Sequence, residues 1–72
     1  MEEKPASELK SGDIIFIDDE EFICVDFYSC PTKRGNIRGV IMINPTNYAK
    51  RDVQYPENYL VPVLQMSPDE AW

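Results

Sequence analysis

Few of the side chains in this sequence could carry out acid–base, nucleophilic or metal chemistry. None of the 72 residues is histidine, which removes the commonest general base near neutral pH and the commonest transition-metal ligand. The two cysteines, Cys24 and Cys30, lack the second pair that a structural zinc site requires. Only Cys30 lies near cations, Lys33 and Arg34, that would activate a thiol. We therefore predict a protein that is not an enzyme and holds no metal or cofactor.

The carboxylates and glycines do not form a recognisable ligand site either. Asp18, Asp19, Glu20 and Glu21 are consecutive and lack the glycine and the spaced acids of a calcium loop, so they are interpreted as a solvated hairpin turn. The three glycines are scattered along the chain, which excludes a phosphate-binding loop. Binding through the surface is the function class that remains.

The apolar residues alternate with polar ones, a pattern typical of strands. Residues 13–17 and 22–28 predict a hairpin around the acidic turn. In the second strand Ile23, Val25 and Phe27 are expected to face the core, with Cys24, Asp26 and Tyr28 facing outward or at an edge. Cys24 is then a semi-exposed neighbour of the core.

The rest of the chain predicts three further strands. Residues 30–36 collect turn formers and indicate a mobile loop, after which residues 37–44 form a strand with Ile37, Ile41 and Ile43 on the face of Gly39. Residues 48–55 are a weaker strand candidate, and residues 59–64, which contain Pro62, indicate an edge strand or the strand that closes a barrel. A helical turn is expected within residues 5–10.

These elements predict an all-β fold in one domain spanning residues 1–72, with a core at about residues 9–65 and flexible tails at 1–8 and 66–72. About five short, mostly antiparallel strands suit an SH3-like barrel, because closure removes exposed sheet edges. The start of the sequence lacks a signal peptide, and there is no apolar run long enough to span a membrane. We expect a cytoplasmic protein with no membrane partner.

The segment from Leu9 to Ile15, followed by the acidic turn and residues 22–27, resembles the N-terminal KOW-type domain of the elongation factor P family. The resemblance covers residues 9 to about 43. It implies a small barrel in which the loop after the second strand presents a modifiable lysine, and Lys33 stands at the matching place. Thr32 stands where the family has a glycine, and the chain has no counterpart of the further domains, so the resemblance implies the barrel and not the function.

Charge is divided unevenly along the chain, whose formal net charge is −6. Residues 1–26 are acidic, residues 27–51 contain five bases and no acid, and residues 52–72 are acidic again. The bases lie in two neighbouring connections and predict one positive patch, flanked by Tyr28 and Tyr48, that binds RNA or single-stranded nucleic acid. Its predicted residues are Lys33, Arg34, Arg38, Lys50, Arg51 and Tyr28. The acidic remainder opposes this reading because it repels phosphate.

The preferred hypothesis is a protein-interaction module, a small adaptor or inhibitor that acts on a larger protein assembly. Its expected anchors are Tyr48, Tyr55, Tyr59 and Trp72, because aromatic side chains dominate interface hot spots. The competing interpretation is that these tyrosines only cover the open end of the barrel. A variant of the inhibitor hypothesis is an acidic mimic of nucleic acid that blocks a basic groove. The sequence leaves the oligomeric state open, and its bipolar charge permits head-to-tail association.

Overall fold

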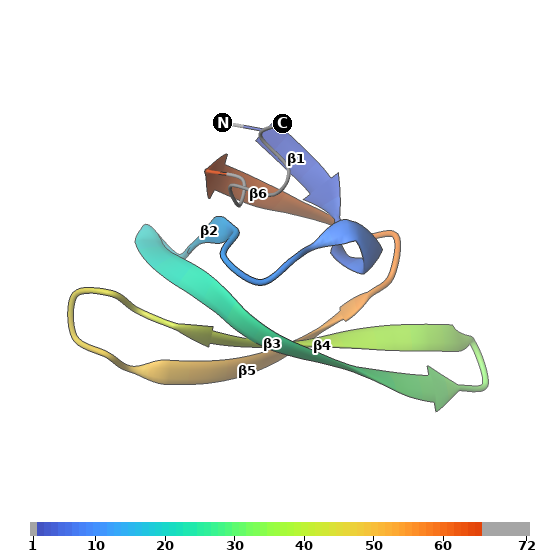
Figure 1. Cartoon of the computed structure of the whole chain (residues 1–72). Coiled ribbons are helices and arrows are strands. Elements are labelled where there is room, and N and C mark those ends of the chain that lie inside the picture. The colour runs from blue at the N-terminus through green and yellow to red at the C-terminus, as the bar shows by residue number, and fades with distance from the viewer. Residues whose placement is uncertain (1, 66–72) are drawn as a thin grey trace.

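The computed structural model describes residues 2–65, and these residues fold as one strongly bent antiparallel sheet (Figure 1). The elements in chain order are β1 (Glu2–Pro5), the 3₁₀ turn η1 (Ala6–Glu8), β2 (Ile14–Ile17), β3 (Glu20–Thr32), β4 (Gly35–Ile43), β5 (Lys50–Pro56) and β6 (Leu60–Gln65). The strand order across the sheet is β1-β6-β2-β3-β4-β5. The all-β class, the antiparallel pairing and the helical turn are confirmed.

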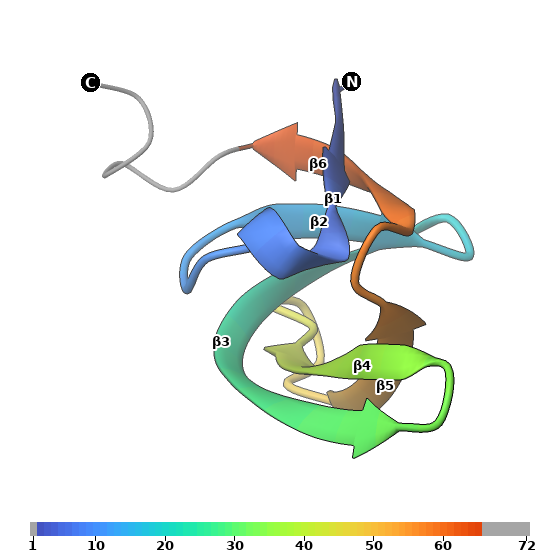
Figure 2. The same ribbon diagram turned by 90° about the vertical axis from the view of Figure 1, so that its right-hand side faces the viewer.

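The sheet curls without closing into the expected barrel. Within residues 2–65, β1 and β5 are the two edges and no ladder joins them. The thirteen-residue β3 bends between two halves of the sheet, pairing first with β2 and then along its length with β4 (Figure 2). The sixth strand is β1, a segment expected to belong to a tail, which pairs with β6 from Glu2↔Val63 to Pro5↔Leu60. Strand β6 therefore lies between β1 and β2, and is not the edge strand that Pro62 suggested.

The core lies on the concave side of the curl and is small. Its buried apolar residues are Ala6, Leu9, Ile15, Phe22, Cys24, Val40, Met42, Val61 and Val63. Ile17, Phe27, Val53 and Tyr55 pack against them while remaining partly exposed. Burying a large apolar side chain contributes about 1.5–3 kcal/mol, so each of these few residues carries a substantial share of the stability.

The predicted orientation of the second strand is wrong around Cys24. The Cys24 side chain is fully buried, whereas Val25 is 40% exposed. The register of β3 against β4 shifts between Cys24 and Asp26, so Val25 occupies a bulge in the strand. The bulge reverses the alternation, which is why Phe22 and Cys24 face the core before it and Phe27 faces the core after it.

The predicted mobile loop at residues 30–36 is instead the end of a hairpin. Strand pairing continues to Thr32↔Gly35, which leaves only Lys33 and Arg34 in the turn. Gly35 closes that turn at φ +118°, a backbone conformation that glycine adopts without strain. The hairpin of residues 13–28 is confirmed, with Asp18 and Asp19 alone forming its turn and Glu20 beginning β3.

The described residues include no helix that is long and apolar enough to cross a membrane.

Candidate interaction surfaces

The β3–β4 hairpin ends in a projecting arm, defined here as residues 31–36 (Figure 1). Strand β5 ends at the pair Ile37↔Pro56, so the arm extends past the sheet and all six of its residues are exposed. Thr32 fixes the turn from inside, because its hydroxyl donates to the Gly35 carbonyl and accepts from the Arg34 N–H at 3.2 Å. The arm thus presents two cations, Lys33 and Arg34, at a defined tip.

An apolar depression of about 440 Å³ lies at the base of this tip. Its lining includes residues 32–36 of the arm together with Ile37 and Pro56, which supply an apolar floor between the two strands. Cations beside an apolar floor can bind a ligand that has both a flat apolar part and a negatively charged part. A nucleotide base with its phosphate and an acidic side chain beside an aromatic ring both have that chemistry.

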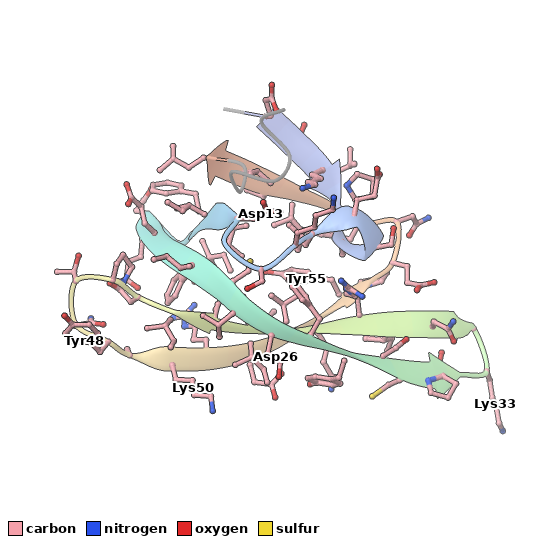
Figure 3. All side chains as sticks on the ribbon, in the orientation of Figure 1. Asp13, Asp26, Lys33, Tyr48, Lys50 and Tyr55 are labelled. Atoms are coloured by element: carbon pink, nitrogen blue, oxygen red, sulfur yellow. The ribbon has the colours of Figure 1, made fainter. Side chains whose placement is uncertain are left out.

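The basic residues predicted to form one patch do not lie together. Lys33 and Arg34 precede β4, while Lys50 and Arg51 follow the turn at its other end (Figure 3). Eight residue steps along β4 separate the two sites by about 27 Å. Arg51 is further engaged, since its guanidinium lies 5.0 Å from the Phe22 ring centroid and 3.7 Å from the Asp18 carboxylate.

The side chain of Arg38 makes contacts within the fold. Its Nη2 donates to the Leu9 carbonyl at 3.1 Å, and its guanidinium stacks over Phe27 at 4.4 Å. Its Nε is buried without a hydrogen-bond partner among residues 2–65. Arg38 also lines a polar depression of about 440 Å³ with Lys4 and Lys10, two cations distant in sequence.

Tyr28 lies flat on the outer side of the sheet. It pairs with Gly39, and a Cβ at Gly39 would fall 2.1 Å from the ring, so only glycine permits this packing. The hydroxyl donates to Asp52 at 2.6 Å and accepts from Gln54 at 3.1 Å. The hydrogen bond to Asp52 raises the pKa of Tyr28. These contacts hold Tyr28 across three strands, with one face of its ring against Gly39.

The predicted aromatic anchors occupy separate positions. Tyr55 and Tyr59 stack with ring centroids 5.3 Å apart at the concave side, where burial raises the pKa of Tyr55. Tyr59 is 51% exposed, so its ring remains accessible to a partner. Tyr48 lies in the β4–β5 turn at the other end of β4, and Trp72 lies outside the described residues.

Tyr48 belongs to an acidic end of the molecule, defined here as residues 18–21 and the β4–β5 turn at residues 44–48. Its side chain is 80% exposed, and its backbone has φ +61°, a conformation unfavourable for a bulky residue. A depression of about 400 Å³ separates the two segments. It is lined by Phe16, Asp19, Glu20, Glu21, Asn44, Thr46 and Asn47. The position of the acidic turn was predicted correctly, but no feature of the sequence indicated that residues 44–48 would face it.

Two features were not found from the sequence. The first is a buried ion pair in which Lys4 Nζ donates to Asp13 Oδ2 at 2.8 Å, with the Lys10 N–H donating to the same oxygen at 2.9 Å. The second is an outer apolar face on the β6 side, where Leu60 and Leu64 are 51% and 43% exposed and Ile14 pairs with Ile23. Residues 2–65 contain no cluster of acidic and cysteine side chains that could hold a metal ion.

No protein-family model matches the chain, and no curated protein matches it. Among solved structures, it is similar to eukaryotic translation initiation factor 5A from Methanococcus jannaschii, with a TM-score of 0.72 and 23% identity over 89% of this chain and 49% of that one. It is also similar to a translation initiation factor eif-5a family protein from Naegleria fowleri, with a TM-score of 0.74 and 18% identity over 88% of this chain and 47% of that one. The chain spans about half the length of these proteins. The likeness supports the translation-factor-like fold expected from the sequence, without singling out the elongation factor P family.

Proposed function

We propose that this chain is a non-enzymatic adaptor that binds a basic protein surface within a larger assembly, using its acidic end as the contact. The proposal rests on the position of Tyr48. Its side chain is 80% exposed, its backbone conformation is unfavourable, and it lies beside an acid-lined depression. The Tyr48 N–H donates to the Asn44 carbonyl at 2.8 Å within the turn, while the side chain stays exposed. An exposed aromatic ring with acids around it suits a partner that offers lysine or arginine beside an apolar pocket.

The mechanism follows from the chemistry of the acidic end. Asp19, Glu20 and Glu21 would attract the basic surface and orient the approach, and Tyr48 would bury its ring as the anchor. The fold holds these groups on two short turns and at the start of β3, so little conformational entropy is lost on binding. Both solved neighbours are described as translation initiation factors, which supports an assembly of the translation machinery as the place of action.

Photocrosslinking tests the proposal directly. With p-benzoylphenylalanine replacing Tyr48, we expect protein adducts in source-cell extract that survive nuclease and disappear in the variant Glu20→Lys/Glu21→Lys. The photoreactive residue in place of Thr32, at the opposite end of the molecule, is the matched control. Absence of a protein adduct at Tyr48, or its loss after nuclease treatment, would overturn the adaptor proposal. Competition by added RNA for the same adduct would indicate that the acidic end imitates phosphate.

The hairpin arm favours a second candidate function, binding of single-stranded RNA. Lys33 and Arg34 are exposed at its tip beside the apolar floor of Ile37 and Pro56. Two phosphate contacts would give a slope of about −1.4 in a plot of log affinity against log salt. We expect Lys33→Glu/Arg34→Glu to abolish binding of a labelled oligonucleotide and Lys50→Glu to leave it intact. Binding that is insensitive to salt would exclude this function.

A further inference from the structure

The edges of the sheet differ in how they are protected from pairing with another strand. Strand β1 has four residues, of which Glu2, Glu3 and Lys4 are charged and Pro5 closes the strand. Short length, charge and proline are the usual devices that keep an edge unpaired. Strand β5 has seven residues: its first half carries the charged Lys50, Arg51 and Asp52, and its second half is the uncharged run Val53-Gln54-Tyr55 before Pro56. Within the described part of the chain, β5 pairs with β4 alone.

The ladder between β4 and β5 determines which backbone groups reach this free edge. Its pairing is regular from Ile43↔Lys50 to Ile37↔Pro56. It is preceded by the bond from the Asn44 N–H to the Ala49 carbonyl at 2.9 Å. Because inward and outward groups alternate along an antiparallel strand, Lys50, Asp52 and Gln54 direct their N–H and C=O groups away from β4. The side chains of these three residues are exposed as well.

We infer that β5 pairs with β5 of a second copy of this chain, antiparallel and with its two-fold axis at Val53. In this register Asp52 lies opposite Gln54 of the other copy, and both have their backbone groups directed to the shared edge. The two symmetric Asp52–Gln54 pairs are therefore hydrogen-bonded pairs, and Val53 faces itself in the non-hydrogen-bonded position. The result is one continuous sheet across an isologous dimer.

The side chains favour this register over its neighbours. On the inner face Arg51 lies opposite Tyr55 of the other copy, which places a cation near an aromatic ring. On the outer face the Asp52 carboxylate meets the Gln54 amide. Moving the axis to Asp52 places two carboxylates opposite each other, and moving it to Arg51 does the same with two guanidinium groups. Like charges directly opposite are destabilising. An axis at Gln54 would bring no like charges together, but it would leave Lys50 and Arg51 without partners in the other β5, so only the axis at Val53 pairs all seven residues of the strand.

A matched pair of substitutions at Gln54 tests the inference by the sign of the effect. Dimerisation is followed by sedimentation equilibrium of the full chain from micromolar to millimolar concentration. Gln54→Glu places a carboxylate opposite Asp52 in both of the symmetric pairs of the dimer. It should raise the dissociation constant of the dimer about fivefold. Gln54→Lys places an ammonium there and should strengthen it, and Asp52→Lys added to Gln54→Glu should restore it. The same two changes at the exposed Asn58 control for net charge and should have little effect.

Disulfide cross-linking tests the position of the axis. In a Cys30→Ser background, Val53→Cys brings two thiols together at Cα separations of about 4.5 Å, within the range that a disulfide spans. Arg51→Cys should not cross-link. Because each copy carries a net charge of −6, added salt should strengthen this dimer, whereas a head-to-tail contact between basic and acidic ends would weaken. A chain that stays monomeric at millimolar concentration, or a dimer that cross-links at residue 51 and not at 53, would overturn the inference.

Discussion

Cys24 is a structural thiol whose chemistry is suppressed by its surroundings. It is fully buried in the core, and its N–H donates to the Asp13 carbonyl at 2.9 Å. Burial, with a smaller contribution from the negative charge of Asp13, raises the pKa of Cys24 from 9.0 to about 12. A thiol held neutral in this way is neither a nucleophile nor a metal ligand at neutral pH.

The raised pKa of Cys24 predicts a loss of stability at alkaline pH. Above pH 9.0 the unfolded chain releases the thiol proton while the folded chain keeps it, so the free energy of unfolding falls until about pH 12. The loss from this group is about 2 kcal/mol between pH 9 and 10.5. Urea titrations should show a smaller decrease over this interval for Cys24→Ala than for the parent chain. Parallel decreases in the two proteins would contradict the assignment.

Asp19 occupies a position in the β2–β3 turn that suits glycine better. Asp18 and Asp19 have φ of +51° and +65°, the pattern of a two-residue turn whose second position prefers glycine. We expect Asp19→Gly to raise the free energy of unfolding by about 0.5–1 kcal/mol. Asp19→Ala removes the same charge but retains a Cβ, so it should be less stable than the glycine variant. Thermal or urea unfolding of the two variants measures the difference, and equal stabilities would argue against the turn conformation.

The alternation of apolar and polar residues was enough to locate the strands, but not to predict which of their side chains face the core. The hairpin of β2 and β3 and the positions of β4 and β5 were predicted because apolar residues recur with period two and turn formers separate them. The bulge at Val25 broke this reasoning, since one extra residue inverts every side chain beyond it and no residue type marks its place. The arm was mistaken for a loop because Pro31, Thr32 and Gly35 are turn formers that the fold uses within strand pairs.

The candidate surfaces were less predictable than the strands, because they depend on which turns meet. Sequence proximity suggested that Lys33 and Lys50 lie together, but a strand of nine residues places its two turns at opposite ends. The acid-lined depression instead joins two turns that are more than twenty residues apart in sequence, residues 19–21 and 44–47. The exposure of Tyr48 and Tyr59 was anticipated from residue type, and whether either binds a partner stays a prediction.

Strand β1 is tied to the rest of the sheet by the buried ion pair of Lys4 and Asp13. The Asp13 side chain is fully buried and that of Lys4 is 10% exposed, so removing the lysine leaves a buried carboxylate without this cation. We expect Lys4→Met to reduce the free energy of unfolding by about 3 kcal/mol. Lys10→Met is the control, because the Lys10 side chain is exposed and only its backbone N–H bonds to Asp13. If both variants unfold at the same urea concentration as the parent, β1 is not held by this pair.

At the scale of the whole molecule, β3 sets the distribution of charge as well as the shape. The acidic turn lies at its beginning and the basic tip of the arm follows its end. A single curved strand thus separates the acidic turn from the basic tip of the arm, while the free edge of β5 lies between them along the ladder with β4. These three surfaces can be changed independently, so adaptor binding, RNA binding and self-pairing can be tested by separate variants.

The outer apolar face predicts a contrast between neighbouring residues of β6. Leu60 and Leu64 are half exposed, whereas Val63 is only 2% exposed in the core. Contiguous exposed apolar side chains of this kind mark surfaces that a partner can cover. Leu60→Lys/Leu64→Lys should lower the free energy of unfolding by less than about 1 kcal/mol and reduce binding of a hydrophobic fluorescent dye. Val63→Lys buries a charge and should prevent folding, as judged by circular dichroism. A double lysine variant as unstable as Val63→Lys would show that this face belongs to the core and is not available to a partner.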